Sequence, residues 1–140
     1  MKKLFAIILI STTLLSLVGC NLSKIEIGVR DGAIYFEHSN RVPEVNILVF
    51  EGQVQVRDPL FFEKLVSCID GKPSKEIECV CENNIYVVEI GKHSFALHKD
   101  HIVIYSSMGY NIKGVNITKV ECTEEEIDEL VALLDAARYN

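Results

Sequence analysis

Short segments in which apolar and polar residues alternate recur along the first half of this 140-residue chain, and a two-residue turn signal separates them in pairs. Alternation with period two is typical of strands that bury one face, and Asp-Gly or a similar dipeptide between two such segments is typical of a tight antiparallel hairpin. The pattern therefore predicts two hairpins, each with one apolar side. They are Ile25 to Arg30 with Ala33 to His38 around Asp31-Gly32, and Val45 to Phe50 with Gln53 to Arg57 around Glu51-Gly52.

A longer alternating region, residues 76–106, predicts four more strands joined by three two-residue turns. Turns at Asn83-Asn84, Gly91-Lys92 and Lys99-Asp100 place all its alternating apolar side chains on one face, and a slip of one residue would invert a strand. We therefore expect a four-stranded antiparallel meander, with one more strand over residues 115–122. The expected neighbours are Ile77 with Ile90, Cys79 with Val88, Cys81 with Tyr86, Val88 with Phe95, Tyr86 with Leu97, Leu97 with Ile102, and Phe95 with Ile104.

Two segments carry helical signals. Asp58-Pro59 combines a capping side chain with proline at the first helical position, and Asp70-Gly71 ends the apolar repeat that follows. Thr123 and Glu126 fit a capping box before a second repeat. We predict an α+β domain with antiparallel sheet or sheets of hairpins plus the meander, one central helix and one C-terminal helix. The apolar stripes are Phe61, Phe62, Leu65, Val66 and Ile69 in the first helix, and Ile127, Leu130, Val131, Leu134 and Ala137 in the second.

The first residues follow a different pattern. A basic start, Met1-Lys2-Lys3, precedes an apolar run from Leu4 to Val18 that polar residues interrupt. The run is shorter than the roughly twenty apolar residues that a membrane-spanning helix needs, and it has the organisation of a signal peptide. It ends in Leu17-Val18-Gly19-Cys20, which resembles the lipobox of bacterial lipoproteins. The resemblance implies cleavage after Gly19, a diacylglyceryl group on the Cys20 sulfur and an acyl chain on its new amino group. We expect no cofactor apart from these covalent lipids.

Lipidation at Cys20 would fix where the protein resides and which residues fold. Two or three acyl chains hold a protein at a bilayer, whereas one chain binds only marginally. We therefore expect a signal peptide over residues 1–19, a lipidated tether over 20–24 and a single domain over 25–140, on the exported side of the bacterial cell envelope. The mature chain keeps 12 basic against 20 acidic residues, a net charge of −8. This charge argues against binding to nucleic acid or electrostatic adhesion to anionic lipid.

Four cysteines remain once the lipid has consumed the Cys20 thiol, and an exported compartment permits their oxidation. Cys79 and Cys81 would have Cα atoms about 6.6 to 6.8 Å apart on one strand, near the outer limit for a disulfide. If disulfides form, we expect Cys68 to join one of these two cysteines and Cys122 to join the other. Buried free thiols are the alternative, and a redox or metal role for Cys79 and Cys81 is a third hypothesis.

Other candidate chemistry is sparse. His98, Asp100 and His101 fall at one predicted turn on the outer face of the meander. They are either ordinary surface side chains or weak ligands of a transition metal, since firm zinc sites use three or four protein ligands. The sequence contains no serine-nucleophile motif, zinc-protease motif, phosphate-binding glycine loop or C-x-x-C pair, so we expect no enzymatic activity.

Two surfaces fit a binding partner. Residues 106–114 carry Met108, Tyr110 and Ile112, apolar side chains that a purely connecting loop does not need. The outer face of the meander is also rich in apolar residues, and cover by the same chain is the favoured reason. We therefore predict a small envelope lipoprotein that binds a protein in the envelope, as inhibitors, immunity proteins and assembly accessories do. The alternatives are a solute- or metal-binding lipoprotein and a structural envelope protein.

Overall fold

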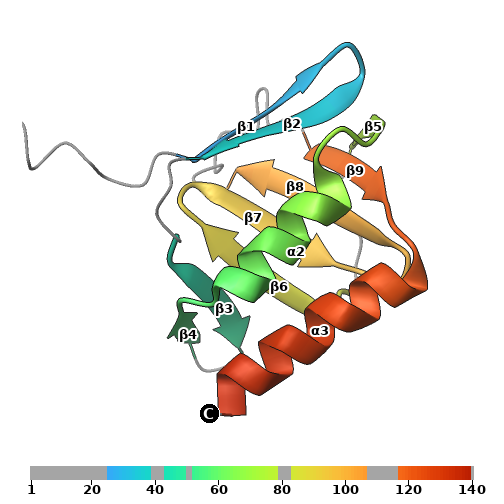
Figure 1. Cartoon of the computed structure of the whole chain (residues 1–140). Coiled ribbons are helices and arrows are strands. Elements are labelled where there is room, and N and C mark those ends of the chain that lie inside the picture. The colour runs from blue at the N-terminus through green and yellow to red at the C-terminus, as the bar shows by residue number, and fades with distance from the viewer. Residues whose placement is uncertain (1–24, 39–42, 50–51, 79–82, 107–116, 140) are drawn as a thin grey trace, which may run out of the picture.

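The structure is a computed structural model, and it describes residues 25–38, 43–49, 52–78, 83–106 and 117–139. These residues form an α+β fold with a two-stranded hairpin, a seven-stranded antiparallel sheet and two helices, which confirms the predicted class. Figure 1 shows both helices on the same side of the large sheet. The elements are β1 (Ile25–Arg30), β2 (Ala33–His38), β3 (Val45–Val49), β4 (Gly52–Val56), α2 (Pro59–Ile69), β5 (Ser74–Ile77), β6 (Tyr86–Ile90), β7 (His93–Leu97), β8 (His101–Ser106), β9 (Ile117–Glu121) and α3 (Glu124–Tyr139).

The centre of the large sheet has the predicted register. The sheet runs in the order β4-β3-β6-β7-β8-β9-β5, so β6, β7 and β8 lie in its middle. Gly91 has a φ of 61° in the turn between β6 and β7, a conformation that glycine adopts without steric cost. The confirmed neighbours are Val88 with Phe95, Tyr86 with Leu97, Leu97 with Ile102, and Phe95 with Ile104.

The second predicted hairpin joins this sheet through β3. Ile47 of β3 lies between Val54 of β4 and Val88 of β6, and all three side chains share the apolar face. The β3–β4 turn falls one residue earlier than predicted, because Val49 lies opposite Gly52. Moving a two-residue turn by one position changes the register by two residues, which leaves every side chain on its original face. The prediction of the apolar face is therefore confirmed, and the prediction of the turn is wrong.

The first strand of the predicted meander is also misplaced. Ile77 of β5 lies opposite Ile117 of β9, not opposite Ile90 of β6. Strands β3 and β7 occupy the two edges of β6, so no edge is left for β5. The four consecutive strands from β6 to β9 do form a meander, which begins one strand later than expected. Cys79 and Cys81, whose expected neighbours depended on the wrong register, lie outside the described residues.

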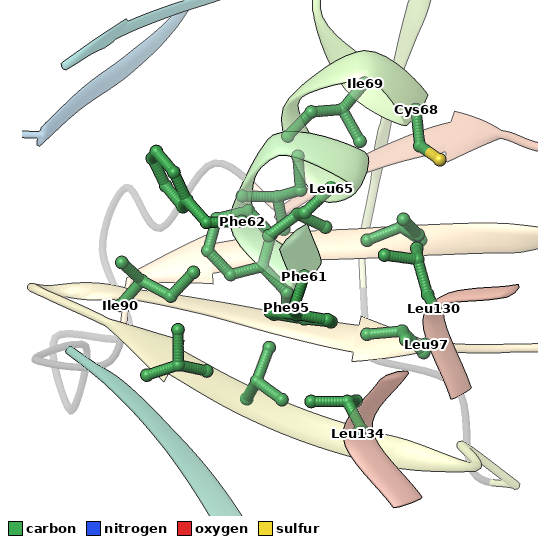
Figure 2. Close-up of a cluster of buried hydrophobic side chains, with 14 of the residues drawn as sticks. Phe61, Phe62, Leu65, Cys68, Ile69, Ile90, Phe95, Leu97, Leu130 and Leu134 are labelled. Carbon is green, nitrogen blue, oxygen red and sulfur yellow. The ribbon is translucent and has the colours of Figure 1, made fainter. Parts of the chain in front are cut away.

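Helix α2 begins where the sequence indicates and packs on the sheet. The Asp58 side chain accepts a hydrogen bond of 2.9 Å from the Leu60 N–H, which satisfies one of the free donors at the helix start. Figure 2 shows Phe61 of α2 beside Phe95 of β7 in the cluster of buried side chains. Each fully buried large side chain contributes about 1.5–3 kcal/mol of transfer free energy. The buried residues of α2 are Phe61, Phe62, Leu65, Cys68 and Ile69.

Helix α3 covers the rest of the same face. The predicted capping box is present: the Glu126 N–H donates to Thr123 Oγ1 at 3.1 Å, and the Thr123 N–H donates to Glu126 Oε2 at 2.9 Å. Three acidic residues in the first turn of α3 stabilise the helix, because their negative charges lie near the positive end of the helix dipole. The predicted stripe then buries Ile127, Leu130 and Leu134 completely. Figure 2 shows Leu130 and Leu134 of α3 near Leu97 of the sheet, and residues of both helices belong to the same buried cluster.

The β1–β2 hairpin also has the predicted register and turn. Asp31 and Gly32 both have positive φ angles, 54° and 77°, as a two-residue type I′ turn requires. The ring of Phe36 meets the ring of Phe62 edge-on, with 5.6 Å between centroids, so the apolar side of the hairpin rests on α2.

Backbone hydrogen bonds tie β2 to the chain that follows α2. The Ile34 N–H donates to the Lys72 carbonyl at 2.9 Å, and the Gly71 N–H donates to the Ile34 carbonyl at 2.8 Å. The Phe36 N–H donates to the Asp70 carboxylate at 3.1 Å. The Ser74 N–H of β5 also donates to the Gly32 carbonyl at 2.9 Å. The hairpin is therefore held at the C-terminal end of α2 and at the start of β5, an edge strand of the large sheet.

Leu65→Ala is expected to lower the free energy of unfolding by about 2–5 kcal/mol, because Leu65 is fully buried between α2 and the sheet. Leu60→Ala removes the same atoms from a residue of the same helix that is 63% exposed, and a change within about 0.5 kcal/mol is expected. Urea unfolding of both variants and the unsubstituted chain gives the two values. Equal losses in the two variants would contradict this placement of α2.

Candidate functional site

A pair of histidines lies at the turn between β7 and β8. The His98 N–H donates to the His101 carbonyl at 2.9 Å, so the two residues face each other across the Lys99-Asp100 turn. Their rings stack with 4.3 Å between centroids and 6° between planes. The prediction that they are cross-strand neighbours is confirmed. The interpretation of both as surface side chains is wrong, because only 5% of His98 is exposed.

Burial and nearby charges change the pKa values of His98 and Asp100. Burial lowers the pKa of the His98 imidazole below its usual range, and repulsion by a charge on His101 adds to the effect, while the backbone of Asn83 opposes it. Asp100 Oδ1 lies 2.6 Å from Nδ1 of His101, and His101 holds the pKa of the Asp100 carboxyl below its usual value. The Nε2 atoms of both histidines are buried and have no hydrogen-bond partner among the described residues.

The stacked geometry does not favour the weak-metal hypothesis. The lone pair of an imidazole nitrogen lies in the plane of its ring, and two nearly parallel planes do not converge on one ion. The described residues contain no group of three or more His, Cys, Asp or Glu side chains placed to hold a metal. Chelation by His98, His101 and Asp100 would therefore need one buried ring to rotate out of the stack.

Cys68 and Cys122 lie next to each other, which the sequence did not predict. The Cys122 sulfur is 3.8 Å from the carbonyl oxygen of Cys68, and both residues are free thiols here. Burial raises the pKa of Cys122 to about 12 and also raises the pKa of Cys68. Neither thiol is therefore set up as a nucleophile at neutral pH. Their proximity depends on how α2 packs against the end of β9, and no local sequence signal reports such a contact.

Two ion pairs join the same two parts of the chain. The Lys72 ammonium lies 2.9 and 2.7 Å from the two carboxylate oxygens of Glu126, and Lys64 pairs with Glu129. Lys72 lowers the pKa of Glu126, and the Thr123 backbone acts in the same direction. These contacts fix the start of α3 beside α2 and the segment that follows it. Sequence reasoning missed them because Lys72 and Glu126 are 54 positions apart.

A depression of about 430 Å³ lies between β1 and the turn that joins β6 to β7. Ile25 and Ile27 supply apolar wall, and Glu26, Lys92 and His93 supply polar groups. Burial lowers the pKa of His93, and the neighbouring Lys92 charge adds to this effect. Sequence analysis did not bring β1 and this turn together, because hairpins fix only the contacts between adjacent strands.

The outer face of the large sheet is closed at its centre. Ala96 and Val103 are cross-strand neighbours on the face opposite the helices, and neither has any exposed surface. Leu48 and Ile85 are exposed by 37% and 47%, respectively. The middle of this face is therefore not a free surface for a partner.

Several predicted sites lie outside the described residues. They include the predicted lipidation site and the predicted partner-binding loop. None of the helices that the structure describes has the length and hydrophobicity needed to cross a membrane. The residues concerned are Cys20, Cys79, Cys81, Met108, Tyr110 and Ile112.

No protein-family model, no curated protein and no solved structure matches this chain. Function is therefore inferred from the motif at the start of the chain and from the geometry of the described residues.

The lowered pKa of His98 gives a prediction of pH dependence. The unfolded chain binds more protons than the folded chain once the pH falls below the ordinary value of 6.5. The contribution of His98 to the free energy of unfolding is therefore complete above about pH 6.5 and is lost as the pH falls through the pKa of the folded state. The pKa of His93 is also lowered, so its contribution is lost in the same direction. An NMR titration of the ring protons is expected to give a His98 midpoint below 6.5. A midpoint at or above 6.5 would contradict the buried stack.

Proposed function

We propose that this chain is a lipoprotein of the bacterial envelope, anchored by acyl chains on Cys20, and that its domain binds another protein close to the membrane. The observation that carries the proposal is Leu17-Val18-Gly19-Cys20, which ends a basic start and an apolar run. A lipid anchor, a stable scaffold and an exposed strand edge suit an inhibitor, an immunity protein or an assembly accessory. None of these roles needs a catalytic group.

The length of the tether supports a site of action near the bilayer. If Cys20 is the mature N-terminus, five residues precede β1, which begins at Ile25. Five residues reach at most roughly 17 Å when fully extended. The β1–β2 hairpin is then the part of the domain nearest the lipid, and a partner that contacts it lies beside the membrane or within it.

The edge of β1 supports protein binding. Within the described residues β1 pairs only with β2, so its second edge offers backbone donors and acceptors that a strand of another chain can use. Val29 is 52% exposed on this strand, and the depression beside Ile25 and Ile27 has room for a partner side chain. We favour this edge over the outer face of the large sheet. The loop with Met108, Tyr110 and Ile112 remains the second candidate surface.

Cys20→Ala is expected to abolish incorporation of radiolabelled palmitate and to leave residues 1–19 on the chain, because the processing steps that the motif implies require the Cys20 thiol. Cys122→Ser is the matched control, since it removes another cysteine and should keep both the label and the cleavage. Autoradiography and the mass of the N-terminal peptide measure the outcome. Palmitate in the Cys20→Ala chain, or its absence from the control, would contradict the proposed anchor.

A photo-crosslinking side chain in place of Val29 is expected to give a discrete adduct with an envelope protein in living cells. The same group in place of Leu60, which is exposed on α2, serves as the control and should give none. A third probe in place of Tyr110 tests the loop. An adduct from the Tyr110 probe alone would move the binding surface to the loop, and no adduct from either position would count against a protein partner.

A further inference from the structure

The two described cysteines come from segments far apart in the sequence. Cys68 lies in the last turn of α2 and has no exposed surface, and Cys122 directly follows β9 and is half-buried. They are 54 positions apart, and the Cys122 sulfur lies 3.8 Å from the Cys68 carbonyl oxygen. Figure 2 shows Cys68 at the rim of the buried cluster, near the C-terminal end of α2.

The surrounding contacts hold these two segments in place. Lys72, four residues after Cys68, binds both carboxylate oxygens of Glu126, four residues after Cys122. Glu126 also closes the capping box at the start of α3. The Cys122 N–H donates to the Asp100 carbonyl at 2.9 Å, which fixes the backbone where β9 ends. The closeness of the two cysteines is thus a consequence of ordered elements on both sides.

We propose that Cys68 and Cys122 are joined by a disulfide in the exported protein, in place of the expected bonds from each of them to Cys79 or Cys81. The inference rests on the proposed export, since an oxidising compartment is required. The two thiols lose two protons and two electrons, a sulfur–sulfur bond forms between them, and the disulfide of a thiol–disulfide oxidoreductase is reduced to a dithiol. The reaction passes through a mixed disulfide between one cysteine and the oxidant.

Burial determines when this bond forms. The folded thiols have raised pKa values, so few thiolates are available to attack an oxidant. Oxidation therefore belongs to the folding step after export, while both cysteines are still accessible to the oxidant. The finished bond is then protected from reduction by the same burial. It joins the end of α2 to the segment before α3, and so fixes both helices over the sheet.

The test is a tryptic map of the lipidated chain taken from membranes, with free thiols alkylated in denaturant and no reductant. The three peptides of interest are residues 65–75 with Cys68, residues 76–92 with Cys79 and Cys81, and residues 120–138 with Cys122. We expect the peptides 65–75 and 120–138 to appear as one disulfide-linked species. Its mass is the sum of the two reduced peptides less two hydrogens. A link from either peptide to residues 76–92, or alkylation of both Cys68 and Cys122, would overturn the proposal.

A stability comparison gives a second readout. Reduction is expected to lower the Tm of the unsubstituted chain to that of Cys122→Ser, and to leave the Tm of Cys122→Ser unchanged. Equal Tm values for the oxidised and reduced unsubstituted chain would count against the bond.

An experiment outside the cell separates the disulfide from the export. The full chain is unfolded, reduced and refolded with oxidised and reduced glutathione, and the same map is made. Free thiols in a lipidated chain would overturn the disulfide and leave the lipoprotein proposal intact. If the chain from cells carries no lipid, the lipoprotein proposal fails, and the refolded chain then tests the disulfide alone. A link between peptides 65–75 and 120–138 in the refolded chain supports the Cys68–Cys122 disulfide. Any other result overturns the disulfide.

Discussion

The apolar face of the seven-stranded sheet is the constraint on which the rest of the fold depends. Its central strands carry large apolar side chains at every second position, and water must be kept from all of them. One helix of 11 residues is too short to cover seven strands, so α2 and α3 share the face. Side chains of both helices and of the sheet form one buried cluster, so the loss of either helix would expose part of it.

This division of the face also explains the position of the sites. Because α2 lies over the centre, its C-terminal end reaches the region where β9 leaves the sheet, which brings Cys68 to Cys122 and Lys72 to Glu126. The same end of α2 supports the β1–β2 hairpin through Phe62 and the backbone after the helix. The hairpin, the ion pairs and the two cysteines thus depend on one helix terminus.

Local patterns in the sequence predicted most of the fold. Two-residue turns specify hairpin register, so the neighbours of Phe95 and Leu97 were correct, and caps at Asp58 and Thr123 placed both helix starts. The alternating pattern of Ile77 and its neighbours shows which face is apolar but not which strand lies beside it. The strand before Asn83-Asn84 was therefore assigned to the wrong edge of the sheet, and that edge belongs to β3.

The sites were less predictable than the fold for the same reason. His98 and His101 were placed together correctly because one tight turn joins them, whereas the burial of His98 depends on other parts of the chain. Cys68 and Cys122 meet only through helix packing, for which the sequence holds no local signal. The proposed lipidation motif is the opposite case, since Leu17-Val18-Gly19-Cys20 are consecutive residues.

The central claim is that the apolar sheet face under α2 and α3 holds the fold, while the β1–β2 hairpin is a less stable unit in which one edge of β1 is unpaired among the described strands. Native-state hydrogen exchange followed by NMR tests it most directly. We predict that the amides of β7 exchange only through global unfolding, and that every second amide of β1, directed away from β2, exchanges fastest among the strand amides. Amides of β1 protected as strongly as those of β7, or rapid exchange in β7, would contradict the account.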